Sequence, residues 1–215
     1  MSEIKNEVRT FLQKYGVDIV GFTEIPSGLR ISEITEDFPR AIVFGYPLSR
    51  AVLNTIENQP TLIYKHHYKT VNWLLDQTAF HLVRFITQKA KRAIAIPASQ
   101  IVDWKNQRGH LPHKILAREA GLGFIGKNGL VVHPEYGAQV RYASVLTDLE
   151  FESDQRLEQT CRDCQRCIAV CPAQAISKDG LNLNRCFDKL KEFSRIRGIG
   201  QYICGVCLKV CDGSH

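Results

Sequence analysis

The spacing of the cysteines constrains this chain more than any other feature. All eight cysteines lie between residues 161 and 211. The first run holds Cys161, Cys164 and Cys167 at two-residue gaps, and Cys171 follows directly before Pro172. Such a run is typical of thiolates that bind 4Fe-4S clusters, because a tight loop brings the first three thiolates to three corners of one cluster. The fourth thiolate of the run serves a second cluster.

A second run completes this pattern near the C-terminus. Cys204, Cys207 and Cys211 repeat the spacing without its first member, and Cys186 supplies the missing thiolate. The arrangement matches the bacterial two-cluster ferredoxins. We therefore predict two 4Fe-4S clusters, one bound by Cys161, Cys164, Cys167 and Cys211, the other by Cys171, Cys186, Cys204 and Cys207.

Two other uses of cysteine fit the chain less well. Structural zinc sites use paired CxxC units with four ligands per ion, which leaves the third cysteine and the Cys171-Pro172 pair unexplained. Disulfides need an oxidising compartment, and the charged, amphipathic residues before Ser27 do not resemble a secretory signal. We therefore expect a reducing, cytoplasmic setting.

The net charge does not require a nucleic-acid partner. The formal charge is +6, but two oxidised clusters with their thiolates carry roughly −2 each and lower the total to about +2. A local basic group remains, made of Lys189, Lys191, Arg195 and Arg197, and we interpret it as a solvated face. The 215 residues contain no apolar run of membrane-spanning length, so we expect a soluble protein without a membrane partner.

Hydrophobic periodicity predicts an α+β first domain followed by a small cluster domain. Helices are expected over residues 3–15, 62–89 and 111–120, and strands over 18–22, 41–46, 93–97, 129–133 and 139–146. Residues 49–60 are ambiguous. The composition becomes acidic and polar between residues 148 and 159, so we expect one domain over 1–152 and a second over 153–215.

A glycine-rich turn follows the third predicted helix. Gly121, Gly123 and Gly126 satisfy GxGxxG, but a dinucleotide site needs a strand before the glycines and a helix after them, and here the order is inverted. The same stretch departs from a P-loop because Asn128 stands where a hydroxyl would hold magnesium. Two interpretations stay open: Lys127 and Asn128 bind a phosphorylated or amide-bearing ligand, or the turn caps the helix with Lys127 in solvent.

Together the glycine turn and the cysteine runs resemble the epoxyqueuosine reductase family and the related corrinoid iron-sulfur reductases. The matching stretches are AGLGFIGKN at residues 120–128, TDL at 147–149, the cysteine run at 161–172, LNLNRC at 181–186, and residues 204–211.

The resemblance implies a cobalamin held between a nitroreductase-like domain and a ferredoxin-like domain, with electrons passing through the clusters to cobalt. It also implies cofactor-binding roles for a set of residues near the corrinoid: Gly121, Gly123, Gly126, Lys127, Asn128, Asn184 and Arg185.

The chain departs from the family pattern at two points. Gln107 stands where the family carries an aspartate thought to protonate the substrate, and a glutamine cannot donate that proton. Asp103, His110 and His113 are the nearby substitutes. The sequence also stops at His215, before the helical-repeat region that family members associate with tRNA binding.

Three functions remain open from the sequence. The first is a cobalamin-dependent reductase of a small molecule, with reduced ferredoxin or flavodoxin as electron donor. The second is an electron-transfer module that reduces a partner, such as a corrinoid protein. The third is a tRNA queuosine-modification enzyme, which would bind tRNA with a strong dependence on salt.

Overall fold

The computed structural model describes residues 2–29 and 37–213 and divides the chain into two compact units. Unit 1 consists of Met1–Tyr46, Asn72–Leu122 and Arg141–Leu157, and unit 2 consists of Pro47–Val71, Gly123–Val140 and Glu158–His215. The last division lies close to the boundary expected at residue 152. Two earlier segments, however, join the cysteine-bearing part of the chain rather than the first domain, so both units are built from discontinuous stretches.

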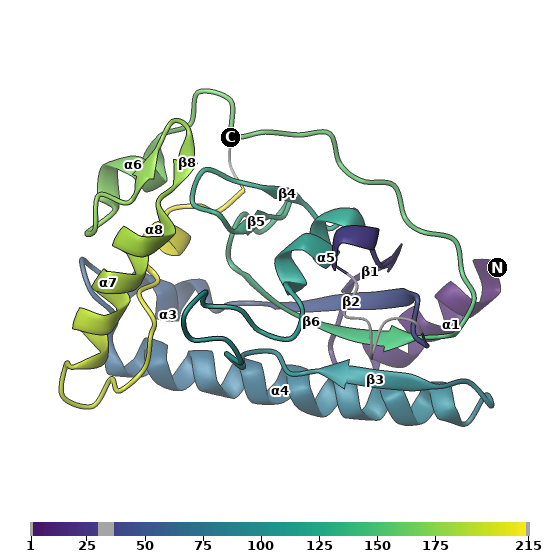
Figure 1. Cartoon of the computed structure of the whole chain (residues 1–215). Coiled ribbons are helices and arrows are strands. Elements are labelled where there is room, and N and C mark those ends of the chain that lie inside the picture. Colours follow the sequence, from purple (N-terminus) through teal and green to yellow (C-terminus); the bar gives the residue numbers. More distant parts are fainter. Residues whose placement is uncertain (1, 30–36, 214–215) are drawn as a thin grey trace. The chain divides into compact units, whose positions relative to one another are not determined.

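The elements follow one another in a mixed helix and sheet order (Figure 1). Unit 1 contains α1 (Ser2–Gln13), β1 (Ile19–Glu24), the 3-10 turn η1 (Ser27–Leu29), β2 (Arg40–Pro47), most of α4 (Leu62–Thr87), β3 (Ala93–Ile96), α5 (His113–Glu119) and β6 (Val140–Thr147). Unit 2 contains α3 (Arg50–Asn54), the start of α4, β4 (Phe124–Ile125), β5 (Val131–Val132), α6 (Arg166–Val170), β7 (Ile176–Ser177), β8 (Gly180–Leu181), α7 (Leu183–Ser194) and α8 (Val206–Lys209).

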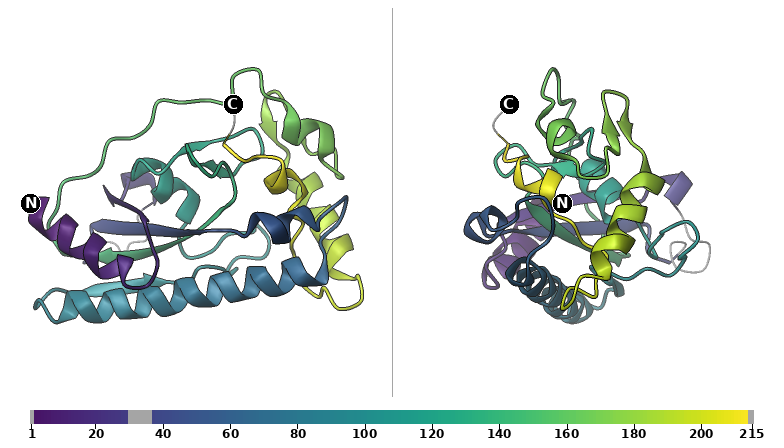
Figure 2. Two further views of the ribbon diagram at one scale, coloured as in Figure 1. Left: turned by 180° about the vertical axis from the view of Figure 1, so that it is seen from behind. Right: turned by 90° about the vertical axis from the view of Figure 1, so that its left-hand side faces the viewer.

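The core of unit 1 is a four-stranded sheet with the strand order β1-β2-β6-β3. β1 pairs antiparallel with β2, and β3 pairs antiparallel with β6. Five successive residues of β1 are buried, and seven of the eight residues of β6 are buried. Burial on both faces explains why these strands do not show the apolar-polar alternation of a sheet with one face in water. Helix α4 lies on one side of the sheet and α5 on the other (Figures 1 and 2).

Helix α4 has the apolar stripe that the sequence predicts. Leu75, Leu82 and Ile86 are fully buried in unit 1. Phe85, on the same stripe, stacks on Phe11 of α1 with ring centroids 4.4 Å apart, and Glu7 of α1 forms an ion pair with Lys89. These contacts attach the first helix to the long one.

The polar stretch before the cysteines is fixed to unit 1. Asp154 accepts a hydrogen bond from the backbone N–H of Phe22 at 3.0 Å, and it forms ion pairs with Lys5 and Arg9. Ser153 accepts a hydrogen bond from the N–H of Glu24 at 2.9 Å. The acidic stretch before the cysteines is therefore an extended segment that is hydrogen-bonded to unit 1.

Helix α5 ends as the sequence predicts, at a glycine. Gly121 has a φ of +70°, and its N–H donates to the carbonyl of Arg118. A Cβ at Gly21 of β1 would lie 2.4 Å from the carbonyl oxygen of Ala120, so only a glycine lets the end of this helix approach the strand.

Two short elements lie where periodicity gave no signal. The glycine turn contains β4, which pairs with β5 to form a small hairpin within unit 2. The ambiguous segment 49–60 contains α3, whose first turn is capped by Ser49 through a hydrogen bond from Val52 N. No helix in the described part of the chain has both the length and the apolar character needed to span a membrane.

Candidate functional site

The eight cysteines of unit 2 surround two small cavities, four thiols to each. The first thiol cavity is bounded by Cys161, Cys164, Cys167 and Cys211, and about 280 Å³ in and around it, part of which is open to solvent, is free of protein atoms. The second thiol cavity is bounded by Cys171, Cys186, Cys204 and Cys207 and has about 380 Å³ of such space. These are the two sets into which the spacing divides the cysteines, and all eight are free thiols.

The thiols of each set influence one another's ionisation. Burial raises the pKa of Cys204 and of Cys211 to about 11, and neighbouring thiols of the same set add to the increase. Burial also raises the pKa of Cys207. Electrostatic interactions with other cysteines act in the same direction, namely with Cys204, Cys186 and Cys171 of its own set and with Cys167 of the other set. The two sets are therefore neighbours, as the packing of α6 against α8 requires.

Cys164 differs from the other perturbed thiols. The backbone N–H of Arg166 donates to its sulfur and lowers its pKa, and the guanidinium of Arg166 acts in the same direction. Arg166 is itself held by Asp212 at 2.9 Å. The start of α6 thus favours a thiolate at this position of the first thiol cavity.

The glycine turn supports the loop of the first thiol cavity. The backbone N–H of Lys127 donates to the sulfur of Cys161 at 3.4 Å. Its ammonium group donates to the carbonyl oxygens of Arg162 at 2.8 Å and Cys164 at 2.9 Å. Lys127 therefore fixes the backbone of the cysteine loop, rather than extending into solvent.

Cys211 is held by the turn that follows β5. The N–H of Ala138 donates to the carbonyl oxygen of Cys211 at 2.9 Å. Gly137 has a φ of +58°, and a Cβ there would lie 2.2 Å from the same oxygen. The sequence shows a turn at this place, but its contact with a cysteine more than 70 residues away depends on the fold.

The second thiol cavity is positioned by the start of α7. Asn182 caps this helix by accepting a hydrogen bond from the N–H of Arg185 at 3.0 Å, which places Cys186 on the first turn. The guanidinium of Arg185 donates to the carbonyl oxygen of Gln174 at 3.2 Å and so ties the helix to the loop after Cys171. Asn184 is exposed on the same turn.

The glycines of the turn are explained by packing within each unit. A Cβ at Gly121 would lie 2.4 Å from the carbonyl oxygen of Gln155, and one at Gly123 would lie 2.4 Å from that of Val132. At Gly126 a Cβ would lie 3.3 Å from the sulfur of Cys161. The absence of side chains at these positions serves close approach by the chain itself.

The expected acid-base residues of unit 1 do not form a group. Asp103 accepts hydrogen bonds from the backbone and side-chain nitrogens of Asn106, which lower its pKa, so this carboxyl is ionised at neutral pH and holds no proton to donate. Gln107 lies in the same tight turn with a φ of +55°. His110 is exposed beyond the turn.

His113 has a structural environment. Its Nε2 donates to the carbonyl oxygen of Pro97 at 2.9 Å, so its Nδ1 accepts from the hydroxyl of Ser144, also at 2.9 Å. Burial lowers its pKa below the ordinary value of about 6.5. Both ring nitrogens thus bind atoms of unit 1.

This environment predicts a loss of stability in acid. The unfolded chain protonates His113 near pH 6.5 while the folded chain keeps it neutral, so the contribution is complete above that pH and is lost as the pH falls below it. We expect at most about 1.4 kcal/mol lost per pH unit. Urea unfolding between pH 7.5 and 5.5 should show a smaller pH dependence in His113→Gln, and equal slopes in the two proteins would contradict this.

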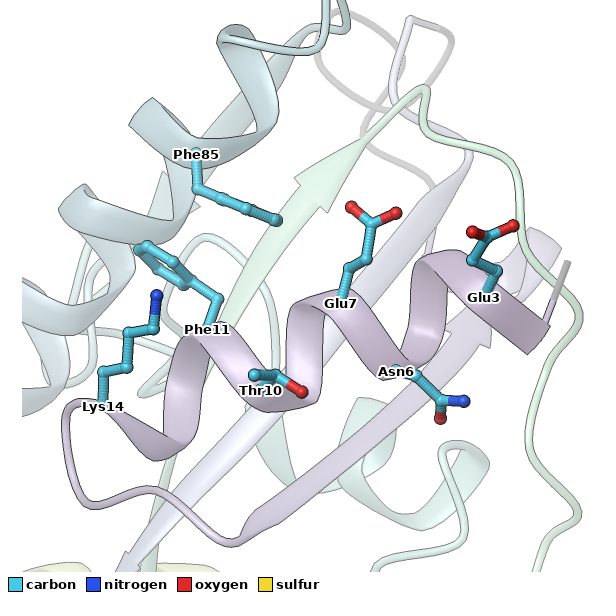
Figure 3. A pocket seen from close by; sticks show the side chains of 7 residues that line it. All are labelled: Glu3, Asn6, Glu7, Thr10, Phe11, Lys14 and Phe85. Atoms are coloured by element: carbon cyan, nitrogen blue, oxygen red, sulfur yellow. The ribbon is translucent and has the colours of Figure 1, made fainter.

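Two surface features are accounted for by contacts within the protein. In the basic group of α7, Lys189 pairs with Glu192 and Lys191 with Asp188, so part of its charge is balanced on the same helix. An open hollow on unit 1, with about 890 Å³ free of protein atoms by the same measure as the thiol cavities, lies between α1 and Phe85 of α4, and Figure 3 shows its lining side chains. Because Glu7 and Phe11 of this lining hold the two helices together, the hollow is the seam of a packing contact.

Sequence similarity to known proteins covers about half of the chain. No protein-family model matches it. The epoxyqueuosine reductase of Lactococcus garvieae is 37% identical over an alignment of 115 residues that covers 48% of this chain and 32% of that protein. That of Bacillus subtilis is 36% identical over an alignment of 112 residues that covers 48% of this chain and 29% of that protein. The matched region thus spans about a third of the length of these curated relatives.

Structural similarity covers nearly the whole chain. A selenomethionine-labelled epoxyqueuosine reductase has a TM-score of 0.67 at 23% identity, over 98% of this chain and 65% of that one. An epoxyqueuosine reductase with a tRNA-Tyr epoxyqueuosine-modified tRNA stem loop gives 0.65 at 22%, with the same coverage. A catabolic reductive dehalogenase in complex with 3-bromo-4-hydroxybenzoic acid gives 0.76 at 16%, over 95% and 31%. In sequence over about half of its length, and in fold over nearly all of it, the chain therefore resembles the epoxyqueuosine reductases.

Proposed function

We propose that the chain is an iron-sulfur oxidoreductase in which the eight cysteines of unit 2 hold two 4Fe-4S clusters. The observation that carries this proposal is the pair of thiol cavities, each bounded by four cysteines. Among the described residues, no three His, Cys, Asp or Glu side chains converge at the distances of a single metal ion. Four thiols around an open space suit a cluster, since each cysteine then binds a different iron atom.

The residues around the cavities fit this cofactor. Each bound cluster would supply one-electron transfer. Lys127 and Arg166 contact thiols of the first thiol cavity. Burial raises the pKa of Cys204 and of Cys211, and at Cys204 the charge of Lys189 acts in the opposite direction. Because two neighbouring sets lie in one small unit, electrons can pass from one to the other. In fold terms, we infer a nitroreductase-like first domain and a ferredoxin-like second domain.

Cobalamin is the second cofactor of the proposal. It is supported by the likeness in fold to the reductive dehalogenase, a structure of which is described as suggesting a mechanism for B12-dependent dehalogenation. Cobalamin would supply a cobalt centre that reduces the substrate. The glycine turn does not provide an open cradle for it, because chain atoms occupy the space beside Gly121, Gly123 and Gly126. No step of the reaction is therefore assigned to residues of this turn.

Cofactor content tests the proposal directly. We expect the anaerobically reconstituted protein to carry about eight irons and, after titration with cobalamin and desalting, about one cobalt. The measurement is an assay of iron, sulfide and cobalt together with the visible spectrum. About eight irons without retained cobalt would favour an electron-transfer module that reduces a corrinoid partner. Iron far below this level would overturn the proposal.

A tRNA substrate is the second candidate. The sequence relatives are epoxyqueuosine reductases, and one similar structure holds a modified tRNA stem loop. A tRNA queuosine-modification enzyme would bind the epoxyqueuosine stem loop with an affinity that falls steeply with salt. Binding that is weak and independent of salt would favour a small-molecule substrate, with reduced ferredoxin or flavodoxin as donor. Either reaction fits a reducing cytoplasm, because all eight thiols are free.

A further inference from the structure

Asn128 lies between the two thiol cavities. The residue lines the first cavity together with Cys161 and Cys167, and it also lines the second cavity together with Cys171 and Cys207. The residue is only 4% exposed. Its amide nitrogen Nδ2 is buried and has no hydrogen-bond partner among the residues that the structure describes. Buried polar groups of native proteins are nearly always paired, so this one requires an explanation.

The orientation of this amide is fixed by the turn. Its Oδ1 accepts a hydrogen bond from the backbone N–H of Leu130 at 3.1 Å. A flipped amide would bring two donors face to face, because both Nδ2 and the Leu130 nitrogen carry hydrogens. The two N–H groups of Nδ2 must therefore point away from Leu130.

The glycines around Asn128 let the turn fit into this narrow place. A Cβ at Gly126 would lie 3.1 Å from Oδ1 of Asn128 and 3.3 Å from the sulfur of Cys161. A Cβ at Gly129 would lie 2.9 Å from Leu181, which lines the second cavity. The turn is thus in close contact with residues of both thiol cavities. The buried side chain of Asn128 therefore lies close to both cavities.

We infer that Asn128 donates hydrogen bonds to sulfur atoms of the clusters in both thiol cavities and raises their reduction potential. This inference rests on the proposed function. Nδ2 has two N–H groups and Asn128 lines two cavities, so cluster sulfur atoms in these cavities would supply the acceptors that Nδ2 lacks. Reduction makes a cluster more negative, so a fixed donor stabilises the reduced form more than the oxidised form. Burial strengthens the effect, because water does not compete for the donor.

Two substitutions distinguish the loss of the hydrogen-bond donor from changes in side-chain shape and charge. Asn128→Leu keeps a similar branched shape and removes the donor without adding a charge. Asn128→Asp keeps the acceptor for Leu130 and replaces the donor by a carboxylate. Asn58→Leu makes the same change at an exposed asparagine of unit 2 and serves as the matched control. The readouts are iron and sulfide content and an anaerobic potentiometric titration followed by electron paramagnetic resonance.

The expected result is a lower potential with unchanged iron in Asn128→Leu. At a fixed ambient potential, the ratio of reduced to oxidised cluster should fall by at least about tenfold, which is about 59 mV for one electron. In Asn128→Asp the ratio of reduced to oxidised cluster should fall further, and in Asn58→Leu this ratio should equal that of the wild type. If Asn128→Leu loses its clusters, Asn128→Ala, which also removes the donor without adding a charge, replaces it as the test, and the same fall is expected.

Two results would overturn the inference alone. In the first, clusters are present and the potentials of Asn128→Leu equal those of the wild type. In the second, only Asn128→Asp shifts, which would be an effect of charge. A wild-type protein that binds no clusters would instead overturn the proposed function, and this inference with it.

Discussion

Replacing Cys171 and Cys186 together by alanine is expected to leave about four of about eight irons in the protein. Both cysteines line the second thiol cavity, and all four cysteines of the first thiol cavity are still present. The double variant should therefore keep one intact cluster with its paramagnetic signal. Iron and sulfide assays on the anaerobically reconstituted protein measure this, beside wild type treated in the same way.

A second double variant makes the test specific. Replacing Cys167 and Cys171 takes one thiol from each cavity, so both clusters should be lost or damaged and iron should fall well below four per chain. The two variants share Cys171 and differ in one further position. If each cluster used its ligands run by run along the sequence, with Cys171 beside Cys161, Cys164 and Cys167, the two iron contents would be reversed.

Gly137→Ala is expected to destabilise unit 2 and to remove the iron of the cluster proposed for the first thiol cavity. A Cβ at this position would lie 2.2 Å from the carbonyl oxygen of Cys211 and 2.3 Å from the nitrogen of Gly213. Both are backbone atoms, so no side chain can move aside to relieve the clash. Together with the cost of alanine at a φ of +58°, we expect a loss of roughly 2–4 kcal/mol in unfolding free energy.

Gly200→Ala is the matched control for this variant. Gly200 has a φ of +57°, and a Cβ there would meet no atom within 4 Å. It should therefore lose only the conformational part, about 1–2 kcal/mol, and keep its iron. Urea unfolding and iron assays on both variants separate backbone strain from the clash at Cys211. Equal losses of stability and iron in the two variants would contradict the role given to Gly137.

The long elements of the fold were predictable because each repeats its pattern several times. Helix α4 was expected over residues 62–89 and runs over Leu62–Thr87, with its apolar stripe buried. The strands over residues 18–22 and 41–46 were expected to be buried, and β1 and β2 are largely buried, whereas three of the four residues of β3 are half-buried. Short elements escaped prediction: β4 has two residues and α3 has five, too few to show a period.

The division into units escaped prediction for a different reason. Residues 47–71 and 123–140 join unit 2 through contacts with chain ends that are distant in sequence. The ammonium of Lys209 donates to the carbonyl oxygen of Ile56 at 2.6 Å, and the side-chain amide of Gln139 donates to the carbonyl oxygen of Lys209 at 2.7 Å. The amino-acid composition of a local stretch does not predict contacts of this kind between distant segments.

The sequence by itself predicted the spacing within each cysteine run and the position of the longer regular elements. Both are properties of short stretches, so neighbouring residues suffice to show them. The fold brings Cys211 to the first run and Cys171 to the second set of thiols. Only the tertiary structure decided what the glycine turn does. It brought Lys127 to the loop of Cys161, Gly137 to Cys211, and the buried amide of Asn128 to a place between two thiol cavities. Those contacts join segments far apart in the chain, and their chemistry exists only once the chain has folded.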